Sequence, residues 1–466
     1  MEQELKKKRR LPLPNNPTLL ILMIVVAALM TYIVPAGEFD RVVDEVTGRT
    51  LVVANTYHAI EGHATTFMEL MQSIYNGMVS ASEIGWFIFV TGGAFGILGR
   101  TGAVTAGLNK LVGKYRGKEA VLLTVITIAF AVGGASFGMC EETLPFIVIL
   151  LPIVVKMGYD PLVAAAITMG ATYCGYSAGV LNPFNTGVAQ GICELPTFSG
   201  MGLRIVLGIG CTIILAWHTL SYAKKNKVTA NSEELRKIAA ENSGLEERDF
   251  NNTDKAILGV LVLTICTLVV CVLKFGWYLQ EISGLFMLMA IVMGLIYFKG
   301  SLNQCVNEFL LGCKDMAVPV MLVCFSKSIL VLLESGGIMD TVVYALSIPL
   351  SHISSVFAAW GMYLAMGLVN FLIPSSSRQA AVVMPIMAPL ADLVGITRQT
   401  AVLAFQCGDG YWNLICPTNA VTMAGIGLAG VSFSKWFKYA LPLVIKQSIW
   451  IFIVLAIAVV TNYGPF

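Results

Sequence analysis

Residues able to do chemistry gather where two long apolar stretches are interrupted. The first interruption carries Glu141 and Glu142, and the second carries Ser375, Ser376 and Ser377 directly after a proline. A carboxylate at membrane depth is costly unless it is paired, protonated or hydrated, so it indicates function. Adjacent helical residues do not share a face. We therefore expect one glutamate to face a ligand while the other contacts protein; the alternative is that both merely end helices at a hydrated tip.

The second interruption favours an anion. A helix that begins after Pro374 presents serine hydroxyls and free backbone N–H groups, which suit a carboxylate; the alternative is ordinary capping by one serine. Arg378 either clamps a substrate carboxylate or pairs with a protein carboxylate such as Glu142. Lys327, inside an apolar run, either substitutes for a coupling ion, pairs with an acid, or extends its amine toward water.

A second polar segment follows each interruption. Its amides, hydroxyls and unwound carbonyls suit the backbone of an amino acid or a sodium ion, whereas an Asn-Pro turn outside the membrane is the alternative. The candidate residues are Asn182, Asn185, Thr186, Thr418 and Asn419. Sodium contacts are expected at Asn182 and Asn419. Asp409, in a polar insertion within an apolar stretch, is either a second anionic contact or a proton-coupling group.

The two sets of interruptions correspond when the halves are overlaid. A constant offset of 237 places Pro152 on Pro389 and Asn182 on Asn419. Interrupted helices survive at membrane depth only inside protein or around a watery cavity. Paired interruptions at matching positions of two halves point to a transporter's binding site. The pattern predicts a secondary transporter whose site lies between the breaks.

Composition places the chain in a membrane. It is 56% hydrophobic and 12% charged, against about 25% charged in an ordinary soluble domain. Runs such as Leu19–Pro35, Ile257–Leu273 and Ala440–Val460 are near the ~20 residues that a spanning helix needs. We predict an all-α polytopic protein of the cell membrane, surrounded by lipid, whose amino terminus is a retained helix rather than a cleaved signal.

Loop charge predicts the orientation, because cytoplasmic loops carry excess Lys and Arg. The amino terminus and the loop at 100–118 are basic, whereas 334–355 has no Lys or Arg. Matching loops on opposite sides indicate two inverted-topology repeats with broken helices and a cytoplasmic amino terminus. The predicted parts are a first half at 1–223 with a re-entrant hairpin at 120–156, a cytoplasmic linker at 224–254, and a second half at 255–466 with a re-entrant hairpin at 356–394.

Other functional classes lack support in the sequence. Neither a P-loop nor an H-E-x-x-H motif occurs, and the four histidines and eleven cysteines show no metal-ligand spacing. We therefore expect no enzymatic activity, no cofactor, no bound metal beyond a transported or coupling ion, and no nucleic-acid partner.

Three motifs together resemble one family over nearly the whole chain. Gly138–Thr143 followed by Pro145, Asn182–Thr186, and Pro374–Ser377 are similar to the YfcC-type, C4-dicarboxylate anaerobic carrier-like family. The resemblance implies membership of the ion transporter superfamily, with two inverted repeats, two re-entrant hairpins, and a homodimer working by an elevator-like movement. The family includes arginine/ornithine exchangers beside members assigned to dicarboxylates.

The charges of the candidate site residues favour one of these two substrate classes, basic amino acids or dicarboxylates. Two acids at one tip, with Asp409 as a third, favour a cationic side chain, while the serine N–H groups and Arg378 hold its α-carboxylate. A dicarboxylate site would present cations and helix amino ends at both tips. The sequence predicts an exchanger of basic amino acids, of the arginine/ornithine kind; the alternative is an ion-coupled carrier of C4-dicarboxylates or another small carboxylate. Coupling to sodium or to a proton stays open.

Overall fold

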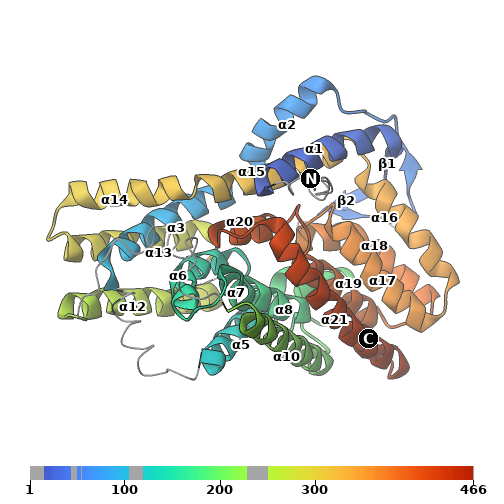
Figure 1. Ribbon diagram of the computed structural model, residues 1–466. Helices are drawn as coiled ribbons and strands as arrows, with labels where there is room; N and C mark the ends of the chain where they lie inside the picture. Colours follow the sequence, from blue (N-terminus) through green and yellow to red (C-terminus); the bar gives the residue numbers. More distant parts are fainter. Residues whose placement is uncertain are drawn as a thin grey trace, which may run out of the picture.

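The computed structural model describes residues 15–43, 50–53, 55–103, 106, 119–227, 250–275 and 277–464. Helices dominate it (Figure 1). Seven of the described helices are long and apolar enough to cross a membrane. The prediction of an all-α polytopic membrane protein is confirmed. The basic amino terminus and most of the predicted 224–254 linker lie outside the described residues, as does most of the 100–118 loop.

The first half begins with a spanning-length helix, a small β region and a shorter helix. Its elements are α1 (Asn16–Ile33), β1 (Gly37–Glu38), β2 (Arg41–Val43), β3 (Thr50–Val52), β4 (His58–Ala59), α2 (Phe67–Ser80), α3 (Ser82–Thr101), α5 (Glu119–Phe137), a 3-10 turn (Glu141–Thr143), α6 (Leu144–Lys156), α7 (Pro161–Ala165), a π turn (Ala166–Gly170), α8 (Ala171–Ala178), a second π turn (Pro183–Gly187), α9 (Val188–Ile192) and α10 (Met201–Lys225). Strand β1 pairs antiparallel with β4, and β2 with β3.

The second half contains only helices among the described residues. Its elements are α12 (Asn252–Phe275), α13 (Leu279–Tyr297), α14 (Leu302–Asp315), α15 (Ala317–Ser335), α16 (Met339–Ser347), a 3-10 turn (Ile348–His352), α17 (Ser355–Asn370), α18 (Ser376–Leu393), α19 (Arg398–Trp412), α20 (Ala420–Leu428) and α21 (Phe433–Val460). Helices α5 and α6 coincide with the first predicted hairpin, and α17 and α18 with the second.

Glycines let the first hairpin approach the helix behind it. A Cβ added to Gly134 of α5 would collide with the carbonyl oxygen of Thr172, and one on Gly175 of α8 would collide with that of Ala131. Small residues at such contacts are what allows membrane helices to pack backbone against backbone. The equivalent contact in the second half joins α17 and α19, where Gly408 lies against the carbonyl of Tyr363.

The two halves hold each other's broken segments. Helix α9 packs on α18 of the second hairpin, whereas α20 packs on α6 of the first, and α8 and α19 cross between them. Around this centre α15 contacts α1, α2, α3 and α20, and α3 contacts α13 and α14; Figure 1 shows α14 and α15 running above the hairpins. Such reciprocal packing supports the predicted repeat, while its inverted orientation in the membrane stays a prediction.

Candidate functional site

Two buried asparagines cap the helices that follow the breaks. Helix α8 stops at Gly179, whose φ of +57° is left-handed. Beyond it, Asn182 Oδ1 accepts hydrogen bonds from the backbone N–H groups of Phe184 at 2.9 Å and Asn185 at 3.2 Å. In the second half Asn419 Oδ1 accepts from the Thr422 N–H at 2.9 Å. The amides satisfy N–H groups that a helix start leaves without partners.

These caps bear on the expected sodium contacts. The side-chain oxygen of Asn182 already accepts two hydrogen bonds. That of Asn419 also accepts two, because the Tyr173 hydroxyl donates to it at 2.8 Å. Both side chains therefore cap helices in this structure, a role that the sequence did not predict for them. A sodium contact at Asn182 and Asn419 stays a prediction, and their side-chain oxygens are poorly placed for it.

The first tip separates its two glutamates. Gly138, with φ +72°, turns the chain so tightly that an added Cβ would lie 2.6 Å from Asn182 Oδ1, so the tip rests on the first break. Glu142 is 4% exposed, and its Oε2 accepts from the Cys140 N–H at 2.9 Å. Glu141 is half-buried instead. Glu142 is thus engaged within its own turn, whereas the more exposed Glu141 is the one left for a ligand.

Glu141 faces charged and aromatic groups from the surrounding helices. Lys327 of α15 and Glu83 of α3 lie within its electrostatic range, as does Tyr278 before α13. Lys327 is half-buried and forms no ion pair within 4.0 Å among the residues that the structure describes. Lys327 thus lies near an acid without pairing with it, and the roles considered for it stay predictions.

Asp409 joins the first break to the second tip. It is 0% exposed, and Asn185 Nδ2 donates to its Oδ2 at 2.6 Å. Ser376 Oγ donates to the same oxygen, and the Tyr176 hydroxyl donates to Ser376 Oγ at 2.7 Å. Three predicted site residues, far apart in the sequence, therefore form one buried cluster, with Tyr176 added by the structure.

Other candidates have structural partners. Thr186 Oγ1 donates to Gln406 Oε1 at 3.0 Å, and Thr418 Oγ1 to the Phe371 carbonyl at 2.8 Å. Ser375 and Ser377 are half-buried at the start of α18. They form no side-chain hydrogen bond among the residues described, which leaves their hydroxyls available.

Arg378 points away from the breaks. Its Nη1 pairs with Glu334 Oε1 of α15, and the two side chains are 52% and 42% exposed. Pairing with a protein carboxylate was one of the two hypotheses for Arg378. The partner is Glu334 rather than the suggested Glu142, which is bound to Cys140. No sequence pattern shows which of several distant carboxylates would pair with Arg378.

Sequence reasoning missed Arg204. This residue near the start of α10 is 0% exposed, its Nε donates to Gln406 Oε1 at 3.0 Å, and its Nη1 donates to the Ser199 carbonyl. Gln406 in turn accepts from Thr186, so the arginine holds the segment after the first break. The signal was present, since a single cation within an apolar spanning run indicates a buried role.

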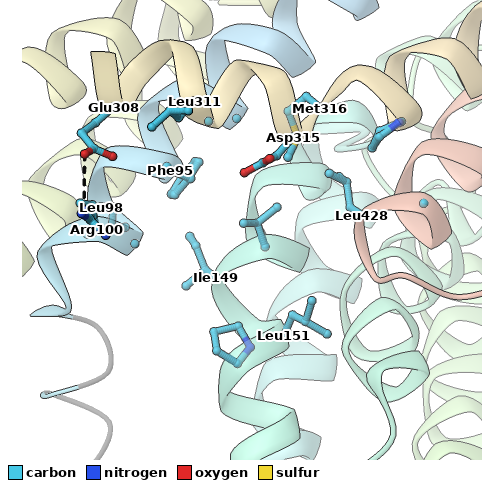
Figure 2. Close-up of a pocket in the computed structure, with 18 of the residues that line it drawn as sticks. Phe95, Leu98, Arg100, Ile149, Leu151, Glu308, Leu311, Asp315, Met316 and Leu428 are labelled. Carbon is cyan, nitrogen blue, oxygen red and sulfur yellow. Dashed lines mark ion pairs between the residues drawn. The ribbon is translucent and has the colours of Figure 1, made fainter. Parts of the chain in front are cut away.

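A cavity of about 750 Å³ lies beside the first hairpin. Residues of α3, α6, α14, α15 and α20 line it, and none belongs to the Asp409 cluster (Figure 2). Arg100 and Glu308 form an ion pair of 3.4 Å at its edge, and Figure 2 shows Asp315 on α14, the helix that also carries Glu308. The cavity borders α6, whereas the predicted ligand-binding residues lie at the tips and breaks.

The chain matches known proteins over most of its length. The family model for the C4-dicarboxylate anaerobic carrier, DcuC, matches residues 13–463. YfcC of Escherichia coli (strain K12), whose name assigns it provisionally to basic amino acid antiporters, is 34% identical over 475 residues, covering 93% of this chain and 94% of YfcC. A Haemophilus influenzae protein without an assigned function is 25% identical, covering 94% and 95%.

Two solved transporters align over nearly the whole chain with lower similarity. The Alcanivorax borkumensis YdaH transporter is 15% identical with a TM-score of 0.41, covering 97% of this chain and 100% of YdaH. Neisseria gonorrhoeae MtrF, described as one of a class of antimetabolite efflux pumps, is 16% identical with a TM-score of 0.41, covering 96% of each chain. Because these identities and TM-scores are low, the site is described from the contacts within this chain alone.

Proposed function

We propose that this chain, which belongs to the C4-dicarboxylate anaerobic carrier (DcuC) family, exchanges basic amino acids such as arginine and ornithine. The family and the named relative YfcC are transporters and not enzymes, so the chain is a membrane transporter. The substrate class, the exchange and the mode of movement are our proposals.

The balance of charge at the breaks carries the substrate proposal. Glu141 and Glu142 lie at the first tip, and Glu83 is within the electrostatic range of Glu141. Of the two nearby cations, Arg378 is occupied by Glu334 and only Lys327 lies near Glu141. Acids therefore outnumber cations around Glu141, which suits a guanidinium or ammonium side chain. The half-buried hydroxyls and backbone N–H groups of Ser375 and Ser377 suit its α-carboxylate. The name of YfcC agrees with this choice.

A carrier of C4-dicarboxylates is the second candidate. The description of the matching family favours it, and the helix start at Ser376 would accept one carboxylate. The other carboxylate would then need a cation at the first tip, where Glu141 and Glu142 stand instead. Only Lys327 offers one there among the described residues, and Glu141 is within its electrostatic range. The acidic tip therefore favours the basic amino acid.

Alternating access is proposed to be elevator-like, with the hairpins and broken helices moving as one body. The reciprocal contacts of α9 with α18 and of α20 with α6 support this, because they tie both tips into a single unit. The 750 Å³ cavity lies between α6 and α20 of that unit and α3, α14 and α15 outside it. We propose it as the approach to the first tip. A homodimer through the outer helices belongs to the same proposal.

A ligand screen tests the substrate. A ligand that binds only the folded state stabilises it by about 2.7 kcal/mol at a hundred times its dissociation constant. We expect arginine, ornithine and lysine to raise the melting temperature of the purified protein, and malate, fumarate and lactate to leave it unchanged, each tested with and without sodium. Counterflow of labelled arginine into ornithine-loaded vesicles should follow the same order. Stabilisation by the dicarboxylates alone would establish the second candidate.

The proposed orientation places the amino terminus and the 224–254 linker in the cytoplasm and 334–355 outside, in the cell membrane. Lys227→Cys and Ala345→Cys, both at exposed positions, test it in a background lacking the eleven native cysteines. An impermeant thiol reagent added to intact cells should label position 345 and spare position 227. Equal labelling of the two would contradict the inverted repeat.

A further inference from the structure

Among the described residues, two of the buried side-chain oxygens that lack a hydrogen-bond partner belong to residues in contact with each other. They are Asp409 Oδ1 and Asn185 Oδ1, and both residues are 0% exposed. Both oxygens are acceptors, so each needs a donor or a cation. A buried acceptor left without a donor destabilises the folded state, and more so when it is charged. Two such acceptors on residues that contact each other require a physical explanation.

The two residues already touch through their other atoms. Asn185 Nδ2 donates to Asp409 Oδ2 at 2.6 Å, and the chain from Tyr176 through Ser376 delivers a second hydrogen to that same oxygen. Every donor therefore reaches one side of the carboxyl group. The unpartnered oxygens are the remaining atoms of two planar groups in contact.

Charged and titratable neighbours do not neutralise Asp409. Tyr176 of α8 and Cys140 of the first tip lie within its electrostatic range. On its own helix Cys407 and Tyr411 are buried as well, and Arg204 of α10 is bound to Gln406 and Ser199. No ion pair to Asp409 is formed within the described part of the chain. A bare carboxylate at this depth would remain unpaired.

We propose that Asp409 carries a proton on Oδ1, held against Asn185 Oδ1, and that this proton is the coupling ion of transport. One proton converts the carboxylate oxygen into a donor, so it satisfies both vacant acceptors at once. A metal cation instead needs a shell of oxygen ligands, whereas Asp409 Oδ2 and Ser376 Oγ are already engaged. The O–H bond forms when a proton arrives from one side of the membrane and breaks when it leaves to the other.

The position of this proton links it to the substrate site, and this step rests on the proposed transport function. Asp409 contacts Asn185, directly after the first break, and Ser376, at the second tip. Loss of the proton leaves a carboxylate, which needs hydrogen-bond donors from the segment of Asn185 and from that of Ser376. Proton binding and tip position are therefore coupled through shared hydrogen bonds.

Infrared spectroscopy of the purified protein tests the proton without any substrate. A protonated carboxyl group has a carbonyl band that a carboxylate lacks. We expect that, in the difference between alkaline and acidic samples, one component of this band is lost in Asp409→Asn and kept in the control Asp40→Asn, whose side chain is 63% exposed. Asn185→Val, which keeps the acid and removes its acceptor, should shift that component. A band unchanged in both Asp409→Asn and Asn185→Val would overturn the proposal.

A transport measurement tests the coupling separately. We expect a pH gradient to change the initial rate of arginine uptake by the wild-type protein severalfold relative to equal pH, and to leave the rate of Asp409→Asn unchanged relative to its own rate at equal pH. A sodium gradient that drives the wild-type protein, with no response to pH, would overturn proton coupling. Failure of arginine as a substrate would refute only the substrate proposal, because the infrared band does not depend on it.

Discussion

The two hairpin tips share a frame but differ in chemistry. Behind each tip a broken helix restarts under a buried asparagine, Asn182 in the first half and Asn419 in the second. The tips themselves carry Glu141 and Glu142 on one side and three serines with Arg378 on the other. The residues that support the backbone therefore match between the halves, whereas the residues proposed to contact a ligand differ. The substrate must be read from the difference between the tips.

The chemical difference between the two tips also predicts an orientation for the proposed substrate. The acidic tip suits a cationic side chain, and the serine tip, at the start of α18, suits a carboxylate. Because α9 packs on α18 and α20 packs on α6, each broken segment contacts the opposite hairpin. A change at one tip therefore reaches the other half directly, and the comparison is best tested with paired variants.

The largest effect is expected at the acidic tip. Removing one partner of a desolvated charge pair costs roughly 2–5 kcal/mol, so Glu141→Gln should weaken binding of arginine and ornithine by an order of magnitude or more. Glu142→Gln should weaken it less, because Glu142 accepts from the Cys140 N–H inside its own turn. Uptake of labelled arginine into ornithine-loaded vesicles measures both variants.

A matched control is Glu61→Gln, an exposed glutamate on the chain before α2, which should exchange as the wild type does. Wild-type exchange in both Glu141→Gln and Glu142→Gln would remove the carboxylates from the site. A dicarboxylate carrier would instead show no arginine uptake in the wild type, and its uptake of labelled malate should tolerate both Gln variants. Measuring both substrates therefore separates the two candidate functions.

The second largest effect is expected on stability, and corresponding variants in the two halves should lower it alike. Asn182→Ala and Asn419→Ala each remove a helix cap, which costs about 0.5–2 kcal/mol, and each also leaves buried donors without partners. We expect both variants to melt at lower temperature than the wild type by similar amounts. Tyr173→Phe, which removes the second donor to Asn419, should cost less. A large loss in only one half would show that the shared frame is less symmetric than its caps.

The sequence predicted the frame better than the contacts. Paired interruptions and matching prolines located both tips and both breaks, because these features follow from local backbone rules. The meeting of Asn185, Ser376 and Asp409 depends on how three distant segments cross, and no local pattern encodes that. The ion pair of Arg378 with Glu334 was missed for the same reason. Arg204 was missed although it is a lone cation within an apolar run of the sequence.

A smaller effect is expected at the serine tip. Ser377→Ala removes one hydroxyl from a half-buried position, and a typical hydrogen bond contributes about 0.5–1.5 kcal/mol. Binding of arginine, ornithine and lysine should weaken alike, by severalfold, because all three carry an α-carboxylate. Titration of each amino acid against the melting temperature measures this. Weakening of one substrate alone would place Ser377 at the side chain instead.

The smallest effect on exchange is expected from Arg378→Gln. The Arg378–Glu334 pair is 52% and 42% exposed, and exposed pairs contribute about 0–1 kcal/mol. Exchange of arginine should stay within severalfold of the wild type, and Glu334→Gln should match it, because each variant breaks the same contact. If Arg378 instead clamps a substrate carboxylate, Arg378→Gln will abolish uptake while Glu334→Gln, which frees the arginine, will not. The two variants therefore report whether the second tip holds its substrate through the serines and backbone or through a cation. A dicarboxylate held by cations at both tips is compatible only with loss of uptake in Arg378→Gln and retention of uptake in Glu334→Gln.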